Sequence, residues 1–380
     1  MPLTSPGAVA VVTTLLVEGA MSRADLARRT GLTPAAVTKV VAPLADAGYL
    51  GERGPSQNGS LGRPSSLVDV RASAAFFAGF KVTDAEVIGV LVDFSGQVRA
   101  SATRALRSAE VDEVVDDIGA MTEELCSGAA GAEEALRYVS VAVSGDVDRA
   151  TGLVSSSPFL RWRGVLLGQL VQRRTGLPAV VDNDVRALTA GEQWFGAGAG
   201  MSSFAVVTIG AGIGCALCTD GRILSGAHGV SGELGHLPVA DPSRSCYCGG
   251  HGCVETVAST ASLLRDVSAA AGTPVQTLEE AVVLGAGGDD RVLAVFAEVG
   301  RVVGLAIASV VNLVGPQCVV LTGEGLAALD LIEPSVRTAL ASQAYGHAIH
   351  SELIVRPLTF EAWARGAATV ALQRFVSAGR

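Results

Sequence analysis

Apolar positions near the N-terminus recur at helical spacing and then give way to short apolar runs between Gly, Asn and Ser. Ser22 and Asp25 form a capping-box pattern that predicts the start of a short helix, and Gly31 ends it. Thr33 and Pro34 supply the N-cap and first turn of the next helix. The residues expected on the buried faces are Leu26, Leu32, Val37, Val40 and Leu44. This pattern predicts a helix-turn-helix followed by a two-stranded wing.

The second helix of this head leaves small and polar side chains on its outward face. Small residues let a helix approach base edges closely, while Thr38 and Lys39 can bond bases or phosphates. Arg63, in a Gly-Arg-Pro sequence of the wing, lies on a narrow extended backbone suited to the minor groove. Two helices alone would equally suit a hairpin for protein contacts, but the wing favours DNA. The predicted DNA-contacting residues are Thr33, Ala35, Ala36, Thr38, Lys39 and Arg63.

Pro43 departs from this pattern because it falls inside the second helix. A proline there removes a backbone donor, so the helix is expected to kink or end at that point.

After residue 71, strand-like runs alternate with helical segments, which predicts an α/β body with mixed sheets. Clear runs are EVIGVLVD at 86–93 and SFAVVTI at 203–209. The most apolar stretch, residues 302–321, is interrupted by Asn312 and by Gly315-Pro316. It therefore predicts a buried helix followed by a core strand, and no membrane span.

Charge and cysteine content narrow the functional classes. The chain has a formal net charge of −9, yet residues 1–71 hold slightly more Lys and Arg than Asp and Glu. Nucleic acid, if bound, is therefore expected to meet the head. The N-terminus lacks the pattern of a signal peptide, so the protein is predicted to be cytoplasmic. Seven cysteines in such a chain indicate a metal site or reduced thiols rather than disulfides.

Three cysteines gather within eight residues, at Cys246, Cys248 and Cys253, and His236 lies ten residues before the first. Thiolates and a neutral imidazole suit tetrahedral zinc, and four protein ligands leave no open position. We therefore predict one structural Zn²⁺ per chain. The alternative is a glycine-rich loop that contains thiols by chance. The remaining cysteines are predicted to be structural: Cys126, Cys215, Cys218 and Cys318.

These motifs together resemble the ROK family, whose name stands for repressors, open reading frames and kinases. The quoted stretches are GELGH at 232–236, CYCGGHGCVE at 246–255, DNDVRALTAGE at 182–192 and GAGIGCALCTDGRILSG at 210–226. The resemblance implies a two-lobed body of the actin and hexokinase type, and the head resembles that of the family's sugar-responsive repressors. The expected domains are a winged helix at 1–71, a first lobe at 72–190 and a zinc-containing second lobe at 191–380, whose last helix packs back on the first lobe.

The resemblance also implies which residues hydrogen-bond sugar hydroxyls, namely Asn183, Asp184, Glu233, His236 and Glu255. A carboxylate accepts from neighbouring hydroxyls, and asparagine both donates and accepts. His236 is expected to place one ring nitrogen on zinc and turn the other toward the sugar. Taken singly, Asp184 could cap the helix that follows, Asn183 could form an Asx turn, and the two glutamates could be surface charges.

Asp184 is also the position of the general base in the family's kinases, so it does not separate enzyme from regulator. The Asp-x-Gly-Gly-Thr-Lys stretch that cradles ATP in those kinases aligns with KVTDAE at 81–86, which lacks both glycines and adds two carboxylates. Ala211 replaces a usual threonine in the second loop, and GEG at 323–325 replaces a glycine run. We therefore predict a regulator without kinase activity. The alternatives are a sugar kinase that also binds DNA and a zinc-stapled scaffold.

The expected partners follow from this interpretation. A small winged helix binds one half-site, so we expect a homodimer or a dimer of dimers on an inverted-repeat operator with an A·T-rich segment. The effector is a sugar or sugar derivative held between the two lobes. Phe159 stands where the family usually has an asparagine that helps to select the sugar. Glucose, xylose, N-acetylglucosamine and phosphorylated sugars therefore all remain candidates.

Overall fold

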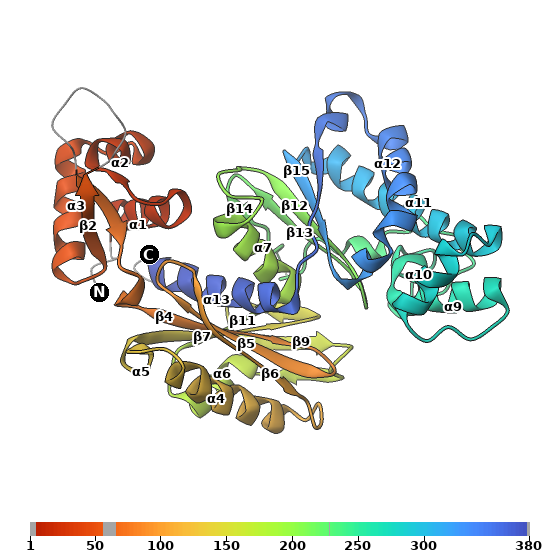
Figure 1. Cartoon of the computed structure of the whole chain (residues 1–380), viewed down its shortest axis with the longest axis horizontal. Helices are drawn as coiled ribbons and strands as arrows, with labels where there is room; N and C mark the ends of the chain where they lie inside the picture. The colour runs from red at the N-terminus through yellow and green to blue at the C-terminus, as the bar shows by residue number, and fades with distance from the viewer. Residues whose placement is uncertain (1–4, 56–65, 228, 378–380) are drawn as a thin grey trace. The chain divides into compact units, whose positions relative to one another are not determined.

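The computed structural model describes residues 5–55, 66–227 and 229–377, and the chain divides into two compact units. Unit 1 comprises Met1–Gly200 together with Phe360–Arg380, and unit 2 comprises Met201–Thr359. The chain therefore leaves unit 1 once and returns to it at the end (Figure 1).

The head of unit 1 is a winged helix-turn-helix, as the sequence predicts. Its elements are α1 (Pro6–Glu18), β1 (Met21–Ser22), α2 (Arg23–Thr30), α3 (Pro34–Asp46), β2 (Leu50–Pro55) and β3 (Ser66–Val70). The three strands form an antiparallel sheet in the order β1-β3-β2. Ser22 and Thr33 each accept a hydrogen bond from the amide three residues later, at 3.1 and 3.2 Å, and so fix the starts of α2 and α3.

The core of the head contains the apolar residues that the periodicity selects. Leu26, Val37 and Leu44 are buried, and Leu32 and Val40 are partly buried against the same cluster. The helical spacing of apolar residues therefore predicts the buried faces of α2 and α3 correctly.

Of the two outcomes expected at Pro43, a kink or an end, the end does not occur. Helix α3 continues to Asp46, and the amide of Ala47 donates to the carbonyl of Pro43 at 3.0 Å. A proline removes only its own amide donor, so the turn that follows it can still close.

The body of unit 1 is built on a mixed five-stranded sheet in the order β11-β7-β4-β5-β6. Strands β4, β5 and β6 are antiparallel neighbours, whereas β4, β7 and β11 are parallel. The elements are η1 (Ala72–Ala74), β4 (Phe76–Val82), β5 (Glu86–Asp93), β6 (Val98–Ala105), α4 (Val111–Ser127), α5 (Ala132–Ala135), β7 (Leu136–Val143), β8 (Asp146–Asp148), β9 (Leu153–Ser157), β10 (Trp162–Val165), α6 (Leu167–Thr175), β11 (Ala179–Asn183), α7 (Asp184–Phe195) and α13 (Phe360–Ser377).

Helix α13, the returning segment, lies along one face of this sheet, and α4 covers the other (Figure 1). Helix α13 lies close against β4 at Gly79, where a Cβ would lie 2.3 Å from the carbonyl oxygen of Ala364. Only glycine permits α13 to pack at this depth on β4. Because side chains alternate along a strand, the odd-numbered residues of β4 face α13 and the even-numbered residues face α4.

Unit 2 contains a second mixed five-stranded sheet, in the order β14-β13-β12-β15-β16. Its elements are β12 (Phe204–Ile209), β13 (Ile213–Thr219), β14 (Arg222–Ile223), η2 (Leu234–His236), α8 (Glu255–Ala258), α9 (Thr260–Ala271), α10 (Leu278–Ala286), α11 (Asp290–Val314), β15 (Cys318–Thr322), η3 (Glu324–Ala328), α12 (Leu329–Gln343), η4 (Gly346–His350) and β16 (Glu352–Val355). The stretch at 302–321 is the end of α11 followed by β15, as predicted.

Helix α11 is also the one helix among the described residues that is long and apolar enough to cross a membrane. In its most apolar window, 61% of the residues are buried inside unit 2, which is typical of a core helix. The mixed α/β architecture with an N-terminal helix-turn-helix is therefore the fold class that the sequence predicts.

Candidate functional sites

Unit 2 brings His236, Cys246, Cys248 and Cys253 together, as the sequence predicts. Their potential ligand atoms all lie within 4.8 Å of one another. The Sγ of Cys246 is 3.7 Å from Nδ1 of His236, and the sulfur atoms of Cys248 and Cys253 are 3.8 Å apart. This arrangement could hold a metal ion.

Two backbone turns build the cluster. The amide of Cys246 donates to the carbonyl of Gly250 at 2.9 Å, which folds Cys248 back toward Cys246. A β-bridge between Pro238 and Cys253 then joins this loop to the end of η2, where His236 lies. Local turns and one bridge are therefore enough to assemble the four side chains.

The thiols of the cluster differ in their ease of ionisation. The amide of Gly250 lowers the pKa of Cys248, whereas burial raises the pKa of Cys253 to about 12. A buried thiol stays protonated without a cation, and a coordinated metal removes the proton. The remaining cysteines are all buried, as predicted for structural residues: Cys126, Cys215, Cys218 and Cys318.

Unit 2 also assembles three of the residues predicted to bind sugar, which are Glu233, His236 and Glu255. Glu233 directly precedes η2, His236 is its last residue, and Glu255 begins α8 two residues after Cys253. Gly235 allows this convergence, since a Cβ there would lie 2.9 Å from Oε2 of Glu255 and 2.6 Å from the carbonyl of Ile213. Because Nδ1 of His236 faces Cys246, Nε2 is the ring nitrogen that remains for another partner.

Glu255 is 8% exposed, whereas Glu233 is exposed. Burial raises the pKa of Glu255, and the nearby imidazole of His236 and hydroxyl of Tyr247 partly oppose this rise. The two glutamates therefore differ in surroundings, and only Glu233 fits the alternative of a surface charge.

In unit 1, Asn183 caps helix α7. Its Oδ1 accepts hydrogen bonds from the amides of Val185 and Arg186 at 3.0 and 3.2 Å, and its Nδ2 donates to the carbonyl of Gly145 at 3.0 Å. The helix cap is therefore Asn183 rather than Asp184. One amide hydrogen of Asn183 remains for a ligand, so the expectation that it offers both a donor and an acceptor is narrowed.

Asp184 forms an ion pair with Lys81 of β4, and each residue is 5% exposed. The other carboxylate oxygen of Asp184 accepts from the amide of Val185 at 2.9 Å. The ammonium of Lys81 also lies 5.1 Å from the centre of the Trp363 ring on α13. Sequence reasoning missed this pair, although a lysine within the apolar run FFAGFKV was a signal for a buried partner.

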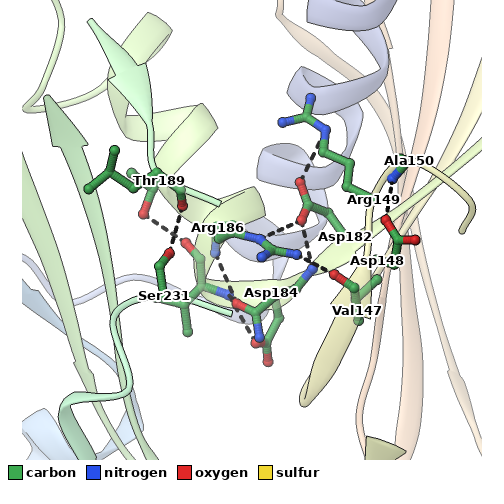
Figure 2. A network of polar contacts seen from close by, with 12 residues as sticks. Val147, Asp148, Arg149, Ala150, Asp182, Asp184, Arg186, Thr189 and Ser231 are labelled. Atoms are coloured by element: carbon green, nitrogen blue, oxygen red, sulfur yellow. Dashed lines mark hydrogen bonds and ion pairs between the residues drawn. The ribbon is translucent and has the colours of Figure 1, made fainter. Parts of the chain in front are cut away.

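A second buried ion pair supports the end of β11 (Figure 2). The Nε of Arg186 donates to Asp182 at 2.7 Å, and a terminal nitrogen of Arg186 donates to the carbonyl of Val147 at 2.7 Å. Arg149 approaches the other oxygen of Asp182 at 3.5 Å. The i,i+4 spacing within DNDVR was the sequence signal for this pair. The network fixes the backbone that carries Asn183 and Asp184.

The two loops that align with the kinase phosphate loops both have amides bonded within the chain. In the β4–β5 turn, Oγ1 of Thr83 accepts from the amides of Ala85 and Glu86 at 3.2 and 2.9 Å. In unit 2, the carboxylate of Glu324 accepts from the amide of Ala211 at 2.7 Å. These amides are therefore occupied by side chains of the same unit.

The predicted DNA-contacting residues on α3 lie at its start. Ala35, Thr38 and Lys39 are exposed, Ala36 is partly buried, and Thr33 caps the helix. The hydroxyl of Thr38 donates to its own helix, at the carbonyl of Pro34, at 3.0 Å. Arg63 lies outside the described residues.

Sequence comparison now places this architecture among known proteins. A profile described as the ROK family matches residues 82–374, which is most of the chain. The chain belongs to the ROK family.

Among ROK proteins, the chain is similar over most of its length to named repressors. It is 28% identical over 336 residues to the DNA-binding transcriptional repressor Mlc of Escherichia coli (strain K12), covering 86% of this chain and 82% of Mlc. It is 26% identical over 365 residues to the xylose repressor of Bacillus subtilis (strain 168), covering 95% and 94%. Both alignments reach beyond the body, so they include part of the head.

Solved structures of a ROK regulator and of a ROK kinase cover different shares of the chain. A ROK transcriptional regulator described as a homologue of the Escherichia coli Mlc protein superposes with a TM-score of 0.82 and 27% identity, covering 98% of this chain and 96% of that one. A ROK hexokinase from Thermus thermophilus superposes with a TM-score of 0.65 and 26% identity, covering 77% and 97%. The kinase therefore matches a smaller part of the chain than the regulator does.

Proposed function

We propose that this ROK protein is a sugar-responsive transcriptional regulator, most simply a repressor, that acts in the cytoplasm. The domain at 1–71 binds operator DNA, and the body binds a sugar effector and transfers no phosphate. The observation that carries this proposal is the winged helix joined to a ROK body, an arrangement shared over 98% of the chain with a ROK transcriptional regulator. Of the relatives that align over most of their length, one is named a DNA-binding transcriptional repressor and another a xylose repressor.

The sugar is held by Asn183, Asp184, Glu233, His236 and Glu255. Carboxylates accept hydrogen bonds from sugar hydroxyls, and a neutral imidazole and an amide add directional contacts. The convergence of Glu233, His236 and Glu255 within unit 2 supports this assignment. Asn183 contributes its remaining amide hydrogen, and Asp184 contributes an oxygen fixed by Lys81.

The metal is Zn²⁺, one per chain, bound by His236, Cys246, Cys248 and Cys253. With Zn–S bonds of about 2.3 Å and Zn–N bonds of about 2.0–2.1 Å, tetrahedral geometry separates two sulfurs by about 3.8 Å and a sulfur from a nitrogen by about 3.6 Å. The two separations given above, 3.8 and 3.7 Å, fit these values, and the other ligand atoms of the cluster lie within 4.8 Å of one another. The ion would close the loop that carries Glu255 and fix the ring of His236.

The loss of phosphoryl transfer rests on three features of the loops. Thr83 occupies the amides of Ala85 and Glu86, and Glu324 occupies the amide of Ala211. A phosphate group at either loop would have to displace the side chain bonded there, and Glu324 would also repel its charge. Lys81 stands in place of the aspartate of the kinase motif and binds the carboxylate that would serve as the base.

The head reads its operator through the start of α3, with Thr33, Ala35, Ala36, Thr38 and Lys39, and through Arg63 in the wing. A single winged helix covers one half-site, so a homodimer or dimer of dimers on an inverted repeat gives useful affinity. Arg63 in the minor groove would favour an A·T-rich segment there.

One experiment tests the function directly. The wild-type protein enriches its own duplex from a random-sequence pool, and fluorescence anisotropy then measures affinity for that duplex with and without glucose, xylose or N-acetylglucosamine. We expect one sugar to change DNA affinity by about 5- to 150-fold. A coupled ADP-release assay with the same sugars and MgATP runs in parallel. DNA binding unaffected by any of these sugars would contradict the proposal, and sugar-dependent ADP release would favour a kinase that also binds DNA.

A further inference from the structure

Helix α13 joins the region of Asp184 to the DNA-binding head within unit 1. Its first turn carries Trp363, which contacts Lys81, and its last turns carry Phe375. Twelve residues separate these two positions, which corresponds to about 18 Å along a helix at 1.5 Å per residue.

At the first end, Lys81 is held from two sides. Gly79 and Lys81 lie on the face of β4 that packs against α13, since the Cβ position of Gly79 meets Ala364 and Ala368. The ammonium of Lys81 therefore lies between the carboxylate of Asp184 and the ring of Trp363. A buried lysine requires such partners, because its charge is costly to remove from water.

At the other end, Phe375 packs in an aromatic cluster that includes the head. Its ring centre lies 5.4 Å from that of Phe77 and 5.9 Å from that of Tyr49. Tyr49 follows the recognition helix α3, and its amide donates to the carbonyl of Leu44 in that helix at 2.9 Å. A displacement of α13 would therefore act on the residues that hold the end of α3.

We propose that Lys81 is a positioning residue that couples the sugar site to the DNA-binding head through Trp363 and helix α13. This inference rests on the proposed function, in which Asp184 accepts a hydrogen bond from a sugar hydroxyl. That hydroxyl competes with Lys81 for the carboxylate, so sugar binding changes how strongly Lys81 is held between Asp184 and Trp363. Because α13 is packed along its length, a shift at its first turn reaches Phe375.

A ligand shifts a conformational equilibrium only through contacts that differ between the two states. Lys81 supplies such a contact because its two partners lie on different elements, α7 and α13. Asp184 fixed by a cation can still accept a hydroxyl proton as a hydrogen bond. Lys81, which stands where the kinase motif has an aspartate, thereby gains a role in signalling.

The test compares Lys81→Met, Lys81→Arg and the neutral double variant Lys81→Met/Asp184→Asn, which leaves no unpaired buried charge. Phe80→Leu is the matched control, since Phe80 is buried on the same strand but faces α4.

For each protein, anisotropy on the enriched duplex gives the ratio of DNA affinities with and without glucose, xylose or N-acetylglucosamine. We expect Lys81→Met, at sugar concentrations that saturate it, to reduce the ratio to within about twofold of unity, from about 5- to 150-fold in the wild type. The double variant also alters a proposed sugar ligand, so its support for the proposal comes from the sugar-free arm below. Lys81→Arg should keep most of it, and Phe80→Leu should keep it despite a lower Tm.

A second arm does not depend on sugar. Amide hydrogen exchange of the sugar-free proteins should show faster exchange around Phe375 and Tyr49 in the double variant than in Phe80→Leu. Exchange that accelerates only near β4 and the first turn of α13, or a wild-type affinity ratio in the double variant, would overturn the proposal. If no sugar alters wild-type DNA binding, the proposed function fails, and the exchange arm still decides whether Lys81 communicates with the head.

Discussion

The two halves of the proposed sugar set differ in how far the protein already uses their polar groups. In unit 1, the side-chain oxygen of Asn183 already accepts hydrogen bonds from two helix amides, and Asp184 is paired with the buried Lys81. In unit 2, Glu233 is exposed, and the Nε2 atom of His236 remains for a ligand while its Nδ1 atom faces Cys246. The comparison teaches that a change at Asn183 or Asp184 should lower folding stability, whereas a change at the exposed Glu233 should mainly weaken ligand binding.

The largest effect should come from removing one ligand of the proposed zinc site in unit 2. Cys253→Ser removes one of the four ligands, and we expect loss of bound zinc, a strongly lowered Tm of unit 2 and no response to sugar. Zinc binding in small zinc peptides is worth about 10–16 kcal/mol, which sets the scale of the loss. Metal analysis and thermal unfolding provide the measurement.

Cys215→Ala is the control for this change, because Cys215 is also buried in unit 2 but lies outside the cluster. It should retain one zinc per chain. Wild-type protein purified without chelator that carries no zinc would refute the metal assignment.

The next effect isolates ligand binding from folding. Glu233→Ala removes an exposed carboxylate, so the free energy of unfolding without sugar should stay within about 0.5 kcal/mol of the wild-type value. Loss of a hydrogen bond to a charged group costs about 1.5–3 kcal/mol, so sugar affinity should fall about 10- to 150-fold. Thermal unfolding checks the stability, titration calorimetry with the active sugar checks the sugar affinity, and anisotropy shows whether operator binding is retained.

Glu352→Ala provides the comparison, as another exposed glutamate of unit 2. It should leave sugar affinity unchanged. If folded Glu233→Ala protein lost operator binding, the separation between the ligand site and the DNA-binding head would be wrong.

A smaller effect should separate the structural use of Asn183 from its use in binding. Asn183→Ala removes the cap of α7 and should lower stability by about 0.5–2 kcal/mol. Sugar affinity should fall as well, because one donor is lost. Ser259→Ala removes a comparable cap from α9 in unit 2 and should lower stability alone. Equal sugar affinity in the two variants would mean that Asn183 serves only the fold.

Local signals in the sequence predict much of the fold. The caps at Ser22 and Thr33 and the strand at 86–93 lie where the pattern places them, since each depends on residues within one turn or one strand. The His/Cys cluster could equally be predicted from the sequence, because its cysteines are close together and its histidine lies ten residues before the first of them.

The contacts that the sequence did not reveal join distant positions. Lys81 and Asp184 are 103 residues apart, and Ala211 and Glu324 are 113 apart. Periodicity shows that a lysine lies in an apolar strand, but not which element supplies its partner. The resemblance implied that the last helix packs back on the first lobe, but nothing in the sequence showed that α13 also packs against the head. Only tertiary structure shows which of these polar residues are already paired.

The smallest effect should come from freeing the backbone amide of Ala211 in the loop at 210–214 of unit 2. Glu324→Ala releases the amide of Ala211, and the vacated position suits an anion, since an amide donor remains and a carboxylate is removed. We expect weak pyrophosphate binding by calorimetry, at millimolar concentration, where the wild type shows none. Glu324→Gln should resemble the wild type because its amide oxygen still accepts from Ala211. Neither variant should release ADP with any sugar, since Thr83 still occupies the amides of the β4–β5 turn and Lys81 still holds Asp184. Equal pyrophosphate binding by wild type and Glu324→Ala would show that Glu324 does not block this loop, and would leave unit 1 alone to explain the loss of phosphoryl transfer.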